Sequence, residues 1–147
     1  MRHLTAEPEA ERRGAAGILI GEFERAEDAS LKWAIGNALS TVATRDVADG
    51  LIGLLQDRRH GAAREMLCDA LRRTKDPRAP EVLIELVDDD DVGGHAILAL
   101  RLYGPRSSLP HLRRAEPKLL QVLGDEGVSP FTRRQADKAL ERLRGQG

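Results

Sequence analysis

Apolar residues recur with helical spacing along this chain, and the same stretch of pattern returns several times. A shift of 32 residues aligns residues 45–57 with residues 77–89 without gaps, so that Leu51 meets Leu83. One further match precedes this pair and one follows it, so the pattern occurs four times. A recurring unit of this length is the sequence signature of a repeat protein.

A second apolar pattern alternates with the first and is anchored on an Ala-Leu pair. Its copies lie at Ala38-Leu39, Ala70-Leu71, Ala99-Leu100 and Ala139-Leu140. Around the first copy, the apolar residues follow the i, i+3, i+4, i+7 spacing of an amphipathic helix. Each repeat is therefore predicted to be two helices, A and then B, which bury their apolar stripes only by stacking on their neighbours.

Proline, glycine and capping residues place the ends of these helices. Pro77 and Pro105 separate an A helix from the next B helix, Pro117 is expected to begin a B helix, and Ser129 is expected to cap the last A helix. Residues 1–8 are expected to be disordered or extended, and residues 9–147 to form a single domain. The expected helices cover about residues 9–27, 30–43, 46–57, 61–73, 79–88, 92–103, 107–114, 117–124 and 130–144.

The recurring polar positions resemble those of a known repeat family. A basic residue (Lys32, Arg64 or Arg133) stands six positions before the Ala of three anchors, and Gly93 replaces it in the fourth. Together with the Ala-Leu anchor and the Asp-Pro-Arg-Ala turn that begins at Asp76, this resembles HEAT repeats, and more closely the short bacterial variety called phycobilisome-lyase-like.

That resemblance carries expectations about fold and function. It implies an all-α, right-handed α-α superhelix, a HEAT/armadillo-like solenoid of about three to four helix pairs with capping helices. It also implies that the recurring Arg and the turn Asp tie neighbouring repeats together. The family includes scaffolds, regulators, chromophore lyases and a few DNA-repair enzymes, so the fold alone does not give the chemistry.

Composition narrows the class of function further. The 147 residues carry a net charge of −1 and only 3% aromatic residues, which disfavours a nucleic-acid-binding protein of the strongly basic type. The lone Cys68 cannot form an internal disulfide, so we expect a reducing compartment, the cytoplasm, and a packed core thiol. The sequence has no apolar run of signal-peptide or membrane-spanning length, so we expect no membrane association.

Metal, cofactor and catalytic patterns are not found. The four histidines lack the spacing of a zinc site and are expected to be partly exposed. The run Asp88 to Asp91 lacks the alternation of a calcium loop and is expected to be a solvated turn, with Asp90 or Asp91 capping the next helix. We therefore expect no enzyme, no cofactor and no metal.

The repeat frame sorts the charges between the two ends of the helices. Nine basic residues against three acidic ones fall at the A-to-B turns, and ten acidic residues against three basic ones fall at the B-to-A turns. The basic set is Arg45, Arg72, Arg73, Lys75, Arg78, Arg101, Arg106, Arg113 and Arg114. Helix dipoles favour basic residues at helix C-termini, which accounts for only part of this sorting.

These patterns favour a non-catalytic protein-protein interaction module, an adaptor, scaffold or regulator with an unknown protein partner. The alternative is nucleic-acid backbone binding through the arginine-rich rim, and a lyase-like enzyme ranks below both. We expect a monomer, because both capping helices have the spacing of closed amphipathic helices. The candidate partner-binding residues are Asp49, Gln56, Glu81, Glu85, Gln121, Arg72, Arg73, Arg78, Arg106, Arg113 and Arg114.

Overall fold

The computed structural model describes residues 3–145, with the side chains of Glu11 and of residues 14–145. This part of the chain holds eight α-helices and two short 3₁₀ segments and contains no strand, as predicted for an all-α fold. The helices are α1 (His3–Arg25), α2 (Ala29–Val42), α3 (Ala48–Gln56), α4 (Glu65–Arg73), α5 (Ala79–Glu85), α6 (Gly93–Arg101), α7 (Leu109–Gly124) and α8 (Pro130–Gly145), and the 3₁₀ segments are η1 (Arg45–Val47) and η2 (Arg58–Arg64).

Internal contacts divide the chain into two compact units, with the division between Asp76 and Pro77. Each unit contains two helices of type A and two of type B. In repeat proteins, each repeat contacts only its neighbours. The single domain expected over residues 9–147 and the right hand of its superhelix stay predictions.

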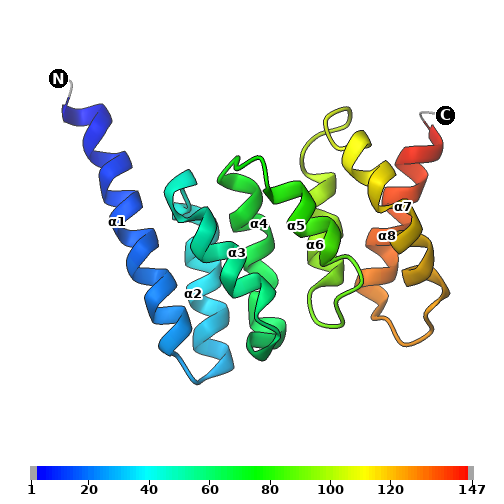
Figure 1. Cartoon of the computed structure of the whole chain (residues 1–147), viewed down its shortest axis with the longest axis horizontal. Coiled ribbons are helices and arrows are strands. Elements are labelled where there is room, and N and C mark those ends of the chain that lie inside the picture. Colours follow the sequence, from blue (N-terminus) through cyan, green and yellow to red (C-terminus); the bar gives the residue numbers. More distant parts are fainter. Residues whose placement is uncertain (1–2, 146–147) are drawn as a thin grey trace. The chain divides into compact units, whose positions relative to one another are not determined.

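The first unit pairs α1 with α2 and α3 with α4 (Figure 1). Helix α2 packs against both α1 and α4, and its N-terminus is capped by Asp28, whose carboxylate accepts a 2.9 Å hydrogen bond from the backbone N–H of Leu31. Such a cap satisfies a donor that the first turn of a helix leaves free. The fully buried side chains of this unit include Phe23, Leu39, Leu51, Leu55, Leu67, Cys68 and Leu71.

The second unit pairs α5 with α6 and α7 with α8, and α6 and α8 also pack side by side (Figure 1). Ser129 caps α8, because its hydroxyl accepts a hydrogen bond of 3.1 Å from the N–H of Thr132, as predicted. The fully buried side chains here include Leu83, Val87, Ile97, Leu100, Leu112 and Leu119.

The recurring Arg position ties an A helix to the end of the B helix before it. Arg64 is fully buried and donates to the carbonyl oxygens of Gly61 at 2.8 Å and Leu55 at 2.7 Å. Arg133 does the same in the second unit, donating to the carbonyls of Leu123 at 2.9 Å and Asp125 at 2.8 Å. Both guanidinium groups therefore satisfy carbonyls that a helix C-terminus leaves without partners.

Gly93 departs from this pattern for a steric reason. Val87 is the repeat equivalent of Leu55 and Leu123, and a Cβ on Gly93 would lie 2.5 Å from the Val87 carbonyl oxygen. The backbone of α6 thus closes directly on the carbonyl that an arginine reaches in the other repeats. Only glycine leaves room for that approach.

Two predicted boundaries were wrong. Helix α1 begins at His3, which places residues 3–8 in a helix where we expected an extended or disordered segment. Helix α7 is continuous, although separate helices were expected at about 107–114 and 117–124, with Pro117 at the start of the second. The buried residues Leu112, Ala115, Leu119 and Val122 form one stripe across Pro117, which is itself exposed, and this burial maintains the helix through the proline.

Candidate functional site

Helices α5 and α7 of the second unit present a polar surface, the α5–α7 face, which carries three of the predicted partner-binding carboxylate and amide residues. Glu81 at the start of α5 forms an ion pair with Arg114 of α7. Lys118 of α7 donates to the Glu85 carbonyl at 3.2 Å and lies 3.4 Å from the Asp88 carboxylate. These contacts hold the two helices in register and leave the side chains of Glu85 and Gln121 exposed.

A pocket of about 410 Å³ adjoins this face where the α5–α6 connection, α7 and the α7–α8 loop meet. Apolar side chains line part of its wall, and carboxylate, amide and hydroxyl groups line the rest. The lining residues are Val87, Asp88, Asp89, Asp90, Gln121, Val122, Asp125, Gly127, Val128, Ser129 and Thr132. Gln121 is one of the predicted partner-binding residues and lines this pocket, whereas the pocket itself was not predicted. The adjacency of two B-to-A turns in the repeat frame is the signal that indicates it.

The aspartates around this pocket have different roles. Asp89 is 5% exposed, and its carboxylate accepts hydrogen bonds from the N–H groups of Asp91 at 2.8 Å and Val92 at 3.1 Å. The prediction that Asp90 or Asp91 caps α6 was therefore wrong, because Asp89 bonds the backbone ahead of that helix. Asp88, Asp90 and Asp91 are exposed, as expected of a solvated turn, but that expectation was wrong for the buried Asp89. The negative charge of these carboxylates favours a cationic group at this surface.

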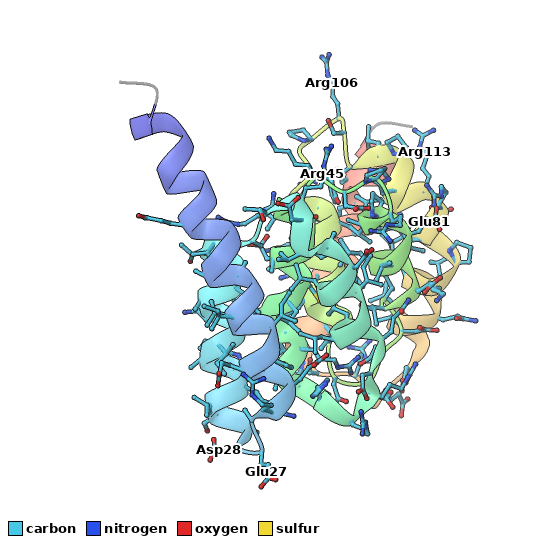
Figure 2. The ribbon with its side chains drawn as sticks, turned by 60° about the vertical axis from the view of Figure 1, so that its left-hand side comes forward. Glu27, Asp28, Arg45, Glu81, Arg106 and Arg113 are labelled. Atoms are coloured by element: carbon cyan, nitrogen blue, oxygen red, sulfur yellow. The ribbon has the colours of Figure 1, made fainter. Side chains whose placement is uncertain are left out.

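The basic residues of the first unit are largely engaged with their own helices. Arg72 and Arg73 both bind the carboxylate of Asp69, at 2.7 Å and 2.9 Å. Arg45 donates to the Lys75 carbonyl at 3.3 Å, which joins the two A-to-B turns of this unit. Figure 2 shows Arg45 toward one end of the unit, with Glu27 and Asp28 at the other. These three residues therefore lie at the ends of the unit that the predicted sorting of charge assigns to them.

The second unit holds the remaining predicted rim arginines. Arg106 and Arg113 are exposed and project outward in Figure 2, and Arg78 and Arg114 are exposed too. Arg101 is partly buried and donates to the Gln135 side chain at 2.6 Å. Burial lowers the pKa of Arg101, and the nearby Arg142 cation lowers that pKa further.

Helix α3 carries the predicted residues of the first unit. Asp49 and Gln56 are both exposed, as is Gly53 between them, and no neighbouring atom lies within 4 Å of the place of a Cβ on Gly53. These positions of α3 therefore present polar or small groups at the surface.

One histidine departs from the expectation of partial exposure. The His60 side chain is 7% exposed, lies 2.8 Å from the Lys32 ammonium through Nδ1, and meets the Phe23 ring edge-on at 5.1 Å between centroids. Burial lowers the pKa of His60, and the Lys32 cation lowers it further. Arg59 holds the pKa of the nearby Asp57 far below its ordinary value of 3.8 by donating to both carboxylate oxygens.

Other groups that the sequence raised as candidates for chemistry lie in packed positions. Cys68 is fully buried, and the His95 ring packs on Phe131 with centroids 4.7 Å apart. His111 meets the Tyr103 ring at 5.0 Å, and burial lowers the pKa of His111. The side chain of His3 lies outside the described part of the chain. Within residues 3–145, no group of three or more His, Cys, Asp or Glu side chains could hold a metal ion, and no helix is long and apolar enough to cross a membrane.

Comparison with known proteins agrees with the repeat architecture. The family model for HEAT repeats matches residues 16–101, from within α1 to the end of α6. No curated protein and no solved structure matches the chain. HEAT repeats commonly mediate protein-protein interaction, and the family is typically non-enzymatic. With four alternating A and B helix patterns, recurring arginine ties and a family match over more than half its length, this chain belongs to the HEAT-repeat family.

Proposed function

We propose that this protein is a non-catalytic protein-binding module, acting in the cytoplasm as an adaptor, scaffold or regulator. The α5–α7 face and the pocket beside it are its binding surface. The observation that carries this proposal is the pocket of about 410 Å³ next to the exposed Glu85 and Gln121. A concave site with apolar walls and a few polar groups is the usual form of a recognition site.

The shape and charge of this surface favour one kind of partner segment. Valines at positions 87, 122 and 128 line the pocket, and Asp88, Asp90 and Asp125 add carboxylates to it. An arginine or lysine side chain combines an apolar stem with a cationic head, so it matches both features. The ion pair of Glu81 with Arg114 and the contacts of Lys118 keep α5 and α7 fixed, so little conformational freedom is lost on binding.

A lysate capture experiment with matched variants tests this function. The full chain is used as bait with and without nuclease, alongside a Glu85→Arg/Gln121→Arg variant of the α5–α7 face. Asp137→Arg, at an exposed position of α8, provides a control for added positive charge within the same unit. We expect a stoichiometric, nuclease-resistant protein that the control retains and the face variant loses.

Two results would contradict the proposal. Equal capture by all three baits would show that the α5–α7 face is not the binding surface. Recovery of nucleic acid alone, lost as salt rises, would favour the alternative of backbone binding through the rim arginines. An Arg106→Ala variant distinguishes that case, because it removes an exposed rim guanidinium group that lies outside both α5 and α7.

A further inference from the structure

Helix α1 has an outer face that nothing in its own unit covers. Ala16 and Phe23 are fully buried and mark the side of α1 that packs on the unit. Glu11, Ile18 and Arg25 lie on the opposite side and are exposed, with Ile18 66% exposed. We expected a monomer because both capping helices were predicted to bury their apolar faces. Helix α1 instead leaves the apolar side chain of Ile18 exposed.

The three outward residues follow a regular spacing. Each step from Glu11 to Ile18 to Arg25 is seven residues, close to two helical turns, so the three side chains lie almost in line along α1. An acidic group and a basic group thus flank a central apolar residue, each about 10 Å away along the helix axis.

This order of charges selects one arrangement of two copies. If two α1 helices meet antiparallel about a two-fold axis at Ile18, then Ile18 meets its own equivalent, and Glu11 of each copy meets Arg25 of the other. A parallel pairing would instead place Glu11 against Glu11 and Arg25 against Arg25, which is unfavourable. An isologous two-fold contact of the antiparallel kind is the commonest form of homodimer.

The backbone around Ile18 leaves room for a close approach. A Cβ on Gly14 or Gly17 would have no neighbouring atom within 4 Å. Arg25 donates an intrahelical hydrogen bond of 2.7 Å to Glu22 and its side chain remains 69% exposed, so its guanidinium can donate to a second carboxylate. Arginine has five donors, enough for both.

We propose that this protein self-associates through an antiparallel, two-fold contact between α1 helices, centred on Ile18 and oriented by Glu11 and Arg25. This goes beyond the proposed partner binding, because it uses a different unit of the chain. A contact over about four helical turns lies at the small end of specific interfaces, so the dimer is weak and concentration-dependent.

Sedimentation velocity over a hundredfold range of protein concentration tests the association itself. The average mass of the full chain is expected to rise toward that of a dimer. Ile18→Arg should raise the dimer dissociation constant at least about tenfold, because two buried apolar contacts are lost per dimer. Leu102→Arg, at a 49% exposed position of the second unit, should leave the constant unchanged. A constant monomer mass at every concentration would overturn the proposal.

Charge reversal and cross-linking test the orientation. Glu11→Arg and Arg25→Glu should each weaken the dimer several-fold, and the double variant should restore it, because opposite charges meet again. A mixture of Glu11→Cys and Arg25→Cys chains, treated with a short bis-maleimide, should give cross-links between the two variants. The native Cys68 is fully buried and does not compete. Cross-links within each variant, without cross-links between them, would indicate a parallel contact and overturn the antiparallel arrangement.

Discussion

The guanidinium of Arg64 donates a 2.7 Å hydrogen bond to the carbonyl of Leu55, nine residues earlier in the chain, from a fully buried position. Arg133 makes the equivalent contact with Leu123 at 2.9 Å in the second unit. In each case a charged side chain replaces water at the end of a B helix. A buried cation is costly unless it is fully hydrogen-bonded, so these arginines are structural elements of the repeat.

Removing Arg64 should therefore destabilise the protein strongly. Arg64→Ala leaves the carbonyls of Leu55 and Gly61 without that donor and opens a cavity, so we expect a loss of about 3 kcal/mol in the free energy of unfolding. Urea denaturation followed by circular dichroism measures this loss. Arg106→Ala, at an exposed position, should change stability by less than about 0.5 kcal/mol. Similar effects of the two substitutions would contradict a structural role for Arg64.

Gly93 and Gly53 should respond to alanine in opposite directions. A Cβ at Gly93 would clash with the Val87 carbonyl oxygen at 2.5 Å, so Gly93→Ala should destabilise by about 1–3 kcal/mol. Gly53 lies inside α3 with open space around it, so Gly53→Ala should stabilise by about 0.5–1 kcal/mol. Thermal unfolding of both variants decides this, and a stabilising Gly93→Ala would show that the close approach of α6 does not limit the side chain there.

Pro117 should destabilise α7, because it interrupts the helix and its exposed ring does not pack in the core. It lies inside α7 and is exposed, so it removes one intrahelical hydrogen bond while its ring is not needed in the core. Pro117→Ala should raise the free energy of unfolding by about 1–3 kcal/mol. Pro110→Ala, in the first turn of the same helix where an N–H has no intrahelical partner, should be close to neutral. An unchanged unfolding curve for Pro117→Ala would mean that α7 is already distorted at this point.

His60 should make stability depend on pH between neutral and mildly acidic conditions. Burial and the Lys32 cation lower its pKa in the folded state below the ordinary value of 6.5, so the unfolded chain binds the proton more readily. As far as His60 is concerned, the free energy of unfolding therefore has its full value above pH 6.5. It falls as the pH drops from there toward the pKa of His60 in the folded state. Asp57 affects stability in a separate pH range. Because its pKa is lowered in the folded state, its contribution to the free energy of unfolding is lost only as the pH falls below the ordinary value of 3.8.

Urea titrations at a series of pH values measure this dependence. His60→Gln should flatten the decline below pH 6.5, and His111→Gln should flatten it as well, because burial also lowers the pKa of His111. The two effects should add, since the residues lie in different units. An unaltered slope in both variants would assign the dependence to other groups.

Sequence periodicity predicted the helical class, the alternation of A and B helices and most helix positions. This worked because each repeat buries its apolar stripe against its immediate neighbours, so the fold is encoded locally. The Ser129 cap was predicted from the local sequence, and the ties of Arg64 and Arg133 were expected from the resemblance to HEAT repeats. All three lie within one turn or one repeat of the groups they contact.

Contacts between residues far apart in sequence were decided only by the tertiary structure. Lys32 meets His60 across 28 positions, and Lys118 reaches Asp88 across 30, and the repeat pattern predicts neither contact. The pocket likewise forms only where two turns of the second unit meet. The sequence by itself determined a HEAT-like succession of helices, because apolar spacing states which face of each helix is buried. The tertiary structure decided which polar groups meet and which remain exposed, because that depends on how far flexible side chains reach between elements.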